Sequence, residues 1–124
     1  MAKTIMIVDD SPLMRASLKA NLELGGYKVE FAGDGVLALA QLKGGAKPDL
    51  IISDVNMPNM GGLELIRTLR TLAGFRFTPV LMLTTESQQA KKDEAKKNGA
   101  TGWLVKPISG PDLIKVIKQV LPGA

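Results

Sequence analysis

Short apolar runs alternate with longer segments of helical period along the whole chain. Five runs predict strands, at residues 4–8, 28–32, 50–54, 80–84 and 102–105. In the segments between them, and after the last, apolar residues recur every three or four positions, which is typical of amphipathic helices. These segments predict five helices, at residues 12–24, 36–43, 62–72, 87–98 and 111–121.

Several helix ends are marked by residues that commonly cap helices. Ser11 and Pro12 suit an N-cap and the first helical position, and Gly25 and Gly26 end that helix. Ser109 is the predicted N-cap of the last helix. That helix has one apolar face, expected to pack on a sheet, formed by Leu113, Val116, Ile117, Val120 and Leu121.

The alternation of elements predicts a three-layer α/β sandwich, because parallel strands need a crossover helix between them. The runs IMIV, LII and VLML are apolar throughout, as in strands that are covered on both faces. The strand at 28–32 alternates polar and apolar residues and the strand at 102–105 is short, so both are expected at the edges. Right-handed crossovers then favour a five-stranded parallel sheet of order 2-1-3-4-5 with five helices, a flavodoxin-like fold.

Charged and hydroxyl side chains stand at the ends of these strands. Asp9 and Asp10 follow the first strand, Asp54 ends the third, Thr84 ends the fourth and Lys106 follows the fifth. The carboxyl ends of parallel strands meet at one edge of the sheet, and ligands bind there, where the strand order reverses. We therefore expect these side chains to lie together, although about 100 residues of sequence separate the first from the last.

Each of these residues has an ordinary interpretation when it is taken alone. Asp10 suits a helix cap or turn, and Thr84 suits the end of a strand. Asp34, in the GDG segment after the second strand, is interpreted as a turn residue, and Met57 and Met60 as loop packing. The combination is different, because three carboxylates at one edge repel one another unless a cation lies among them.

The chain contains no cysteine and no histidine. It therefore has no disulfide, no thiolate or imidazole metal ligand and no Ser-His-Asp triad. The reactive groups that remain are carboxylates, lysines and hydroxyls. Carboxylates suit Mg²⁺, which prefers oxygen ligands, and Lys106 and Thr84 suit a phosphoryl group. The available nucleophile is a carboxylate, as in enzymes that form aspartyl phosphates.

At 124 residues the chain suits one domain, expected to span residues 1–124. Its net charge of +4 is compatible with nucleic-acid binding, but Asp93 and Glu94 interrupt the lysines of the segment at 90–99. We interpret that segment as a solvated face or a protein-docking surface, and expect no nucleic-acid partner. The sequence has no stretch typical of a membrane span or signal peptide, so we expect no membrane partner and a cytoplasmic protein.

With these features established, the chain resembles a response-regulator receiver domain, and more narrowly the stand-alone chemotaxis proteins of the CheY type. The resemblance rests on four blocks, which are VDDS, LIISDVNMPNMGG, LMLTTE and LVKP. VDD or KP alone would be weakly specific, whereas the four blocks together in this order are highly specific. Their order and spacing fit the family over all 124 residues.

The resemblance implies a role for each matching residue. Asp54 would accept a phosphoryl group from a histidine kinase of the chemotaxis type, and Lys106 and Thr84 would contact the phosphoryl oxygens. It also implies one Mg²⁺ ion, held by Asp9, Asp10, Asp54 and the backbone carbonyl of Asn56.

The resemblance further implies a conformational switch. Thr84 would move inward upon phosphorylation, and Trp103 stands where the family has a switch aromatic, usually Tyr or Phe. The alternative for Trp103 is an exposed aromatic on an edge strand. The bond between Lys106 and Pro107 would be cis, as it is in the family. Thr85 stands where Ala or Gly is frequent, which would crowd access to the phosphoryl site.

The function that we predict is a phosphorylation switch that changes the affinity of the chain for a protein target. The target would dock on the fourth helix, fifth strand and fifth helix, and would be a flagellar motor switch protein or a phosphatase. We expect a monomer without an attached output domain.

Three alternatives remain open. The chain would instead serve as a phosphorelay intermediate or phosphate sink, as a Mg²⁺-dependent aspartyl phosphohydrolase, or as a docking module that works without phosphorylation. The hydrolase is disfavoured because its nucleophile would lie in a DxD loop, whereas this sequence has the adjacent pair Asp9 and Asp10.

Overall fold

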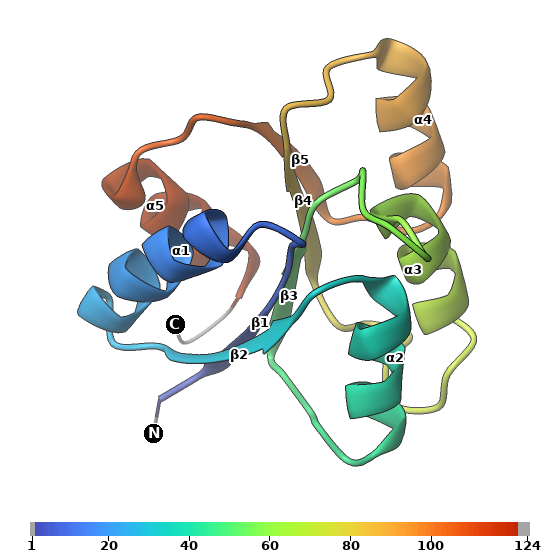
Figure 1. Cartoon of the computed structure of the whole chain (residues 1–124), viewed down its shortest axis with the longest axis horizontal. Coiled ribbons are helices and arrows are strands. Elements are labelled where there is room, and N and C mark those ends of the chain that lie inside the picture. Colours follow the sequence, from blue (N-terminus) through green and yellow to red (C-terminus); the bar gives the residue numbers. More distant parts are fainter. Residues whose placement is uncertain (1, 122–124) are drawn as a thin grey trace.

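Five parallel strands form the centre of the molecule, and the computed structural model describes residues 2–121. The strands are β1 (Thr4–Val8), β2 (Lys28–Ala32), β3 (Leu50–Ser53), β4 (Val80–Thr84) and β5 (Gly102–Val105). The helices are α1 (Pro12–Leu24), α2 (Gly35–Lys43), α3 (Gly62–Leu69), α4 (Gln89–Lys97) and α5 (Gly110–Val120). The sheet order is β2-β1-β3-β4-β5, which confirms the predicted topology, including the two edge strands. Helices α1 and α5 cover one face of the sheet, and α2, α3 and α4 cover the other (Figure 1).

The hydrophobic core is divided by the sheet into two clusters of side chains. Strands β1, β3 and β4 contribute to both clusters, because alternate residues point to opposite faces. Every residue from Ile5 to Val8 is fully buried, and burying such side chains stabilises the fold by about 1.5–3 kcal/mol each. The predicted apolar face of α5 packs on the sheet, since Leu113 and Ile117 are buried there. The three central strands therefore hold the carboxyl edge of the sheet rigidly.

The predicted caps are confirmed at both of the helices that pack on the α1–α5 face. The Ser11 hydroxyl oxygen accepts a hydrogen bond from the Met14 N–H at 3.2 Å. The Ser109 hydroxyl oxygen accepts one from the Asp112 N–H at 3.2 Å. Helix α1 is the longest of the described helices, with 13 residues, and none of them is long and apolar enough to cross a bilayer.

Several predicted boundaries differ from the structure by one to three residues. Strand β3 ends at Ser53 rather than at Asp54, and α3 ends at Leu69 rather than at residue 72. The chain turns after Leu69 because the Arg70 guanidinium binds three carbonyl oxygens, those of Phe75, Thr78 and Gly99. Burial lowers the pKa of Arg70.

Helix α4 also begins later than predicted, at Gln89 rather than at residue 87. The carboxylate of Glu86 accepts a hydrogen bond from the Gln88 N–H at 3.0 Å, and residues 86–88 lie outside the helix. Helices α2 and α5 each begin one residue earlier than predicted, at Gly35 and Gly110. None of these differences moves a predicted site residue away from the end of its strand.

Candidate functional site

The backbone beyond three strand ends is fixed by hydrogen bonds that continue the sheet. The Asp9 N–H donates to the carbonyl oxygen of the last residue of β2 at 3.1 Å. The Asp54 N–H donates to the carbonyl oxygen of the last residue of β1 at 2.9 Å. Lys106 donates to the last residue of β4 at 2.8 Å. The last residue of β1 pairs in register with the last residues of both β2 and β3, so these strands end level. The sheet itself therefore brings the side chains of Asp9, Asp54 and Lys106 to one edge.

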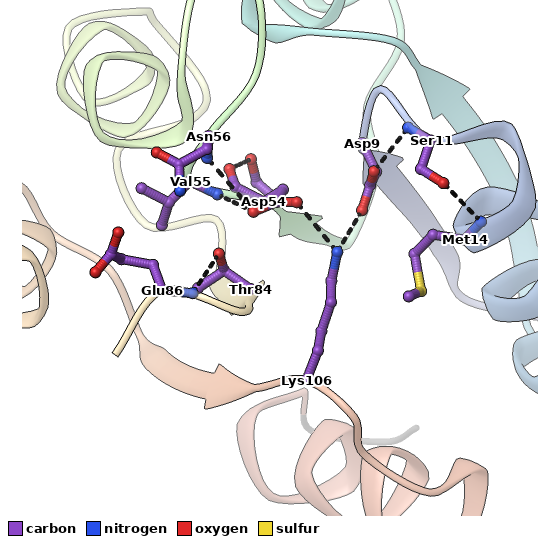
Figure 2. A network of polar contacts seen from close by, with 10 residues as sticks. Asp9, Ser11, Met14, Asp54, Val55, Asn56, Thr84, Glu86 and Lys106 are labelled. Carbon is purple, nitrogen blue, oxygen red and sulfur yellow. Dashed lines mark hydrogen bonds and ion pairs between the residues drawn. The ribbon is translucent and has the colours of Figure 1, made fainter. Parts of the chain in front are cut away.

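Lys106 links the two aspartates that follow β1 and β3. Its ammonium nitrogen lies 2.9 Å from Asp9 Oδ2 and 3.1 Å from Asp54 Oδ2 (Figure 2). The side chains of Lys106, Asp9 and Asp54 are 11%, 3% and 14% exposed, so both ion pairs are largely shielded from water. Burial lowers the pKa of Lys106, but the hydrogen bonds and charges of Asp9 and Asp54 outweigh it and raise that pKa above its ordinary value. Lys106 is therefore a fixed positive charge at neutral pH.

A cluster of three carboxylates lies beside this lysine. Asp9, Asp10 and Asp54 each offer one carboxylate oxygen, and these oxygens lie within 4.8 Å of one another. Asp9 is buried, Asp10 is exposed and Asp54 is half-buried, so the cluster opens to solvent on the side of Asp10. Mg²⁺ binds oxygens at about 2.1 Å, which places the ligands of one ion within about 4.2 Å of each other. The three carboxylates therefore fit Mg²⁺ after small side-chain movements.

Backbone N–H groups hold one oxygen of the Asp9 carboxylate and one of the Asp54 carboxylate. Asp9 Oδ1 accepts a hydrogen bond from Ser11 at 2.9 Å. Asp54 Oδ1 accepts one from Val55 at 2.6 Å and a long one from Asn56 at 3.4 Å (Figure 2). Both carboxylates are therefore oriented before any ligand arrives. Asn56 follows Asp54 by two residues in the loop after β3, and the role of its backbone carbonyl as a metal ligand stays a prediction.

The two predicted switch residues are linked through a residue that the sequence did not single out. Thr84 is fully buried, and its hydroxyl oxygen accepts a hydrogen bond from the Glu86 N–H at 3.1 Å. The indole N–H of Trp103 donates to the Glu86 carbonyl at 3.2 Å. Trp103 is half-buried against the core cluster on the α2–α4 face, so it is not a freely exposed edge aromatic. Glu86 belongs to the LMLTTE block, but the sequence does not reveal this link, because Glu86 makes it through its backbone.

The remaining predictions about single residues also have structural outcomes. Thr85 is exposed, and its effect on access to the phosphoryl site stays a prediction. The bond between Lys106 and Pro107 is cis, as the resemblance implied. Met57 and Met60 pack against the core cluster on the α2–α4 face, which confirms that they are packing residues.

Asp34 is more than the turn residue that the sequence suggested. Its carboxylate accepts a hydrogen bond from the Leu37 N–H at 2.9 Å and caps α2, and it is 5% exposed. The signal for a cap was present, because aspartate directly before a helix commonly fills this position. Its second hydrogen bond, to Asn59, is invisible in the sequence.

Gly62 allows α3 to begin directly against the acidic site. A Cβ atom at this position would overlap the backbone carbonyl oxygen of Asp54 and would lie 2.6 Å from Cε of Met82. The carbonyl belongs to rigid backbone at the end of the sheet, so the helix or the Asp54 segment would have to shift. No side chain larger than hydrogen fits without that shift.

We predict that Gly62→Ala destabilises the protein by about 1–3 kcal/mol, the usual cost of overpacking. Urea unfolding followed by circular dichroism would measure this change. Gly33→Ala is the matched control, since its Cβ would meet only the side-chain ends of Arg15 at 3.3 Å and Leu37 at 3.5 Å. The control is expected to change stability by less than about 0.5 kcal/mol. Equal stability of the two variants would contradict the role given to Gly62.

Comparison with known proteins shows which family and which proteins this sequence resembles. The profile of the response regulator receiver domain matches residues 5–118. Protein PilH of Pseudomonas aeruginosa is 40% identical over 122 residues, which cover 96% of this chain and 98% of PilH. Chemotaxis protein CheY1 of Helicobacter pylori is 37% identical over 120 residues, which cover 96% of both chains.

The fold also matches that of solved structures closely. Chemotaxis protein CheY4 of Vibrio cholerae is 46% identical and superposes with a TM-score of 0.92, covering 98% of this chain and all of the other. A putative response regulator of Chloroflexus aurantiacus superposes with a TM-score of 0.91 at 31% identity, covering 98% of each chain.

Proposed function

The chain belongs to the response regulator receiver family, and on that basis we propose that it is a phosphorylation switch with Asp54 as the acceptor. The observation that carries this proposal is the position of the Asp54 carboxylate. It lies 3.1 Å from the Lys106 ammonium and within one cluster with Asp9 and Asp10. A nucleophilic carboxylate beside a fixed cation and a metal-binding cluster suits phosphoryl transfer.

In the proposed reaction an oxygen of Asp54 attacks the phosphorus of a phosphohistidine in a histidine kinase. The new O–P bond forms as the P–N bond breaks, and the imidazole nitrogen leaves with the electron pair of that bond. Lys106, which pairs with Asp54 Oδ2 before the reaction, would transfer its contact to a phosphoryl oxygen. The Thr84 hydroxyl accepts from the Glu86 N–H, so its own proton is available to a second phosphoryl oxygen.

Asp9, Asp10, Asp54 and the Asn56 carbonyl would hold a Mg²⁺ ion, which supplies positive charge to the phosphoryl oxygens. Asp9 and Asp54 are already oriented by backbone N–H groups, so they would need little reorganisation to bind the ion. Asp10 is exposed and would close onto the ion from the solvent side.

The proposed output passes from Thr84 to Trp103. Movement of Thr84 toward a phosphoryl group would disturb its hydrogen bond with Glu86, whose carbonyl accepts from Trp103. Trp103 lies on β5 beside α4, which carries four exposed or half-exposed lysines, Lys91, Lys92, Lys96 and Lys97. We infer that a protein target reads this α4–β5–α5 surface, and that a flagellar motor switch protein or a phosphatase is the target, because relatives are chemotaxis proteins.

The direct test is phosphorylation of the purified protein by a small phosphodonor such as acetyl phosphate. With Mg²⁺ present, the intact mass is expected to increase by one phosphoryl group, and with EDTA it is expected to stay unchanged. The reason is that the transferred group needs a cation beyond Lys106 to balance its charge. An unchanged mass in the presence of Mg²⁺ would overturn the proposal.

A role as a phosphorelay intermediate or phosphate sink uses the same chemistry at Asp54. A chase experiment with the phosphorylated protein, together with a measurement of target binding, separates this role from that of a switch. A switch is expected to bind its target more tightly when phosphorylated, whereas a sink is expected to drain phosphoryl groups from the kinase without any change in target binding.

A further inference from the structure

The loop between β3 and α3, residues 54–61, carries Asp54 and Asn56, and its outer part is fastened to the turn before α2. The side-chain amide of Asn59 donates to Asp34 Oδ2 at 2.8 Å. The other oxygen, Asp34 Oδ1, accepts from the Leu37 N–H at 2.9 Å. Both oxygens of this buried carboxylate therefore have partners, one in α2 and one in the loop. We call the side-chain hydrogen bond between these residues the Asp34–Asn59 clamp.

The backbone reinforces the clamp at the next residue in each segment. The Gly35 N–H donates to the Met60 carbonyl at 3.0 Å. A Cβ atom on Gly35 would lie 2.7 Å from Cγ and 2.9 Å from the carbonyl oxygen of Met60, so the two segments are in close contact. Met60 also packs against the core cluster on the α2–α4 face. Figure 1 shows α2 and α3 side by side on that face.

Asn59 has an unusual backbone conformation, with φ of 66°. Residues other than glycine rarely adopt this left-handed region, although asparagine does so more readily than most. Such a conformation persists only where its surroundings impose it. At Asn59 two hydrogen bonds hold the conformation. One joins its side-chain amide to Asp34, and in the other the Met60 N–H donates to the Pro58 carbonyl at 2.7 Å.

The base of the same loop is closed next to the acidic cluster. The Gly62 N–H donates to the Val55 carbonyl at 2.9 Å, and the N–H groups of Val55 and Asn56 both point to Asp54 Oδ1. The loop is therefore held at Asp54 by the sheet and at Asn59 by the clamp. Asn56 lies between these two points, and its N–H bond to Asp54 is long, at 3.4 Å. The position of its carbonyl therefore depends on how both of these points are held.

We propose that Asp34 and Asn59 are positioning residues that set the Mg²⁺ affinity of the site by holding the β3–α3 loop in place. The clamp acts through Asn56, because it fixes the part of the loop that follows this ligand. This inference rests on the proposed function, since it takes Asn56 and the three aspartates as the metal ligands. It adds a second group of residues, outside the metal site, that determines how well the site is formed.

The test measures the dissociation constant for Mg²⁺ by isothermal titration calorimetry. Asn59→Gly removes the amide but tolerates the positive φ, and it changes no charge. Asp34→Asn keeps an oxygen for the Leu37 N–H but places an amide opposite Asn59. Each single variant is expected to bind Mg²⁺ roughly 3- to 10-fold more weakly than the wild type, below the 10- to 100-fold loss typical of groups that bond directly to a metal ligand.

The double variant Asp34→Asn with Asn59→Asp exchanges donor and acceptor across the same bond. It is expected to restore the affinity to within about 2-fold of the wild type, because aspartate also tolerates positive φ. Asp49→Asn is the matched control for charge. Its carboxylate accepts from the Thr4 N–H at 2.8 Å, beside the first residue of β1 rather than at the carboxyl edge of the sheet. This control is expected to bind Mg²⁺ like the wild type.

Urea unfolding without metal separates a positioning role from a purely structural one. If Asn59→Gly and Asp34→Asn lose stability but bind Mg²⁺ as the wild type does, the inference is wrong. It is also wrong if both single variants bind weakly and the exchange does not restore affinity, since the loss then has another cause. If the wild-type protein itself binds no Mg²⁺, the proposed function fails, which is a different result from equal binding by all variants.

Discussion

Replacing Asp54 with asparagine is expected to abolish phosphorylation by a small phosphodonor in the presence of Mg²⁺. The amide keeps the size of the side chain and an oxygen for the Val55 N–H, which lies 2.6 Å from Asp54 Oδ1. It removes the negative charge that makes the second oxygen a nucleophile. The two carboxylates that remain in the site are not expected to replace Asp54, because their surroundings differ from its own. Asp9 is buried against Lys106, and Asp10 is exposed. Intact-mass measurement is expected to show no added phosphoryl group.

The matched control for this change is Asp93→Asn. Asp93 lies on α4, where its carboxylate accepts a hydrogen bond from the Gln89 side chain, and it takes no part in the acidic cluster. This variant is expected to be phosphorylated at the same rate as the wild type. Mapping the modified residue after proteolysis adds a second check. A phosphoryl group found on Asp9 or Asp10 in the wild type would refute the assignment of Asp54.

The topology could be predicted because each central strand carries its own signal. IMIV, LII and VLML are apolar throughout, and the structure buries these strands on both faces. Parallel strands that end level bring the residues after them to one edge, whatever their separation in sequence. The grouping of Asp9 and Asp54 with Lys106 therefore followed from topology alone, although 97 residues separate Asp9 from Lys106.

The contacts that orient the site could not be predicted in the same way. Glu86 joins Thr84 to Trp103 through its backbone, and a backbone group has no sequence signature. Helix α3 ends at Leu69 because the Arg70 guanidinium binds the carbonyls of Thr78 and Gly99, 8 and 29 residues further along the chain, which overrides the helical pattern that continues to residue 72. Such bonds depend on the packing of whole elements, and local propensity contains no information about them.

A second large effect is expected at Lys106, the cation that separates two carboxylates. In Lys106→Met, Asp9 and Asp54 would face each other across a shielded site without a positive charge between them. Removing one partner of a fully buried ion pair costs about 3–5 kcal/mol. This site opens to solvent beside Asp10, so we expect a smaller loss of stability, about 1–3 kcal/mol in the absence of metal.

The same variant is expected to respond more strongly to Mg²⁺ than the wild type does. The ion would replace the missing charge next to Asp9 and Asp54, so Mg²⁺ should raise the unfolding temperature of Lys106→Met by more than that of the wild type. Lys118→Met, which removes an exposed lysine of α5, is the control and should respond like the wild type.

Phosphorylation of Lys106→Met is expected to be slower than that of the wild type by roughly 10²- to 10³-fold at saturating Mg²⁺, the usual loss when a group that stabilises developing charge is removed. Mg²⁺ would restore the charge balance of the resting site. It could not, however, bind both carboxylates and also occupy the position of the ammonium, which lies 2.9 Å from Asp9 and 3.1 Å from Asp54 in the wild type. Stability and rate should therefore separate, with Mg²⁺ restoring the first and not the second. A rate equal to that of the wild type would mean that Lys106 only balances the charge of the unphosphorylated site.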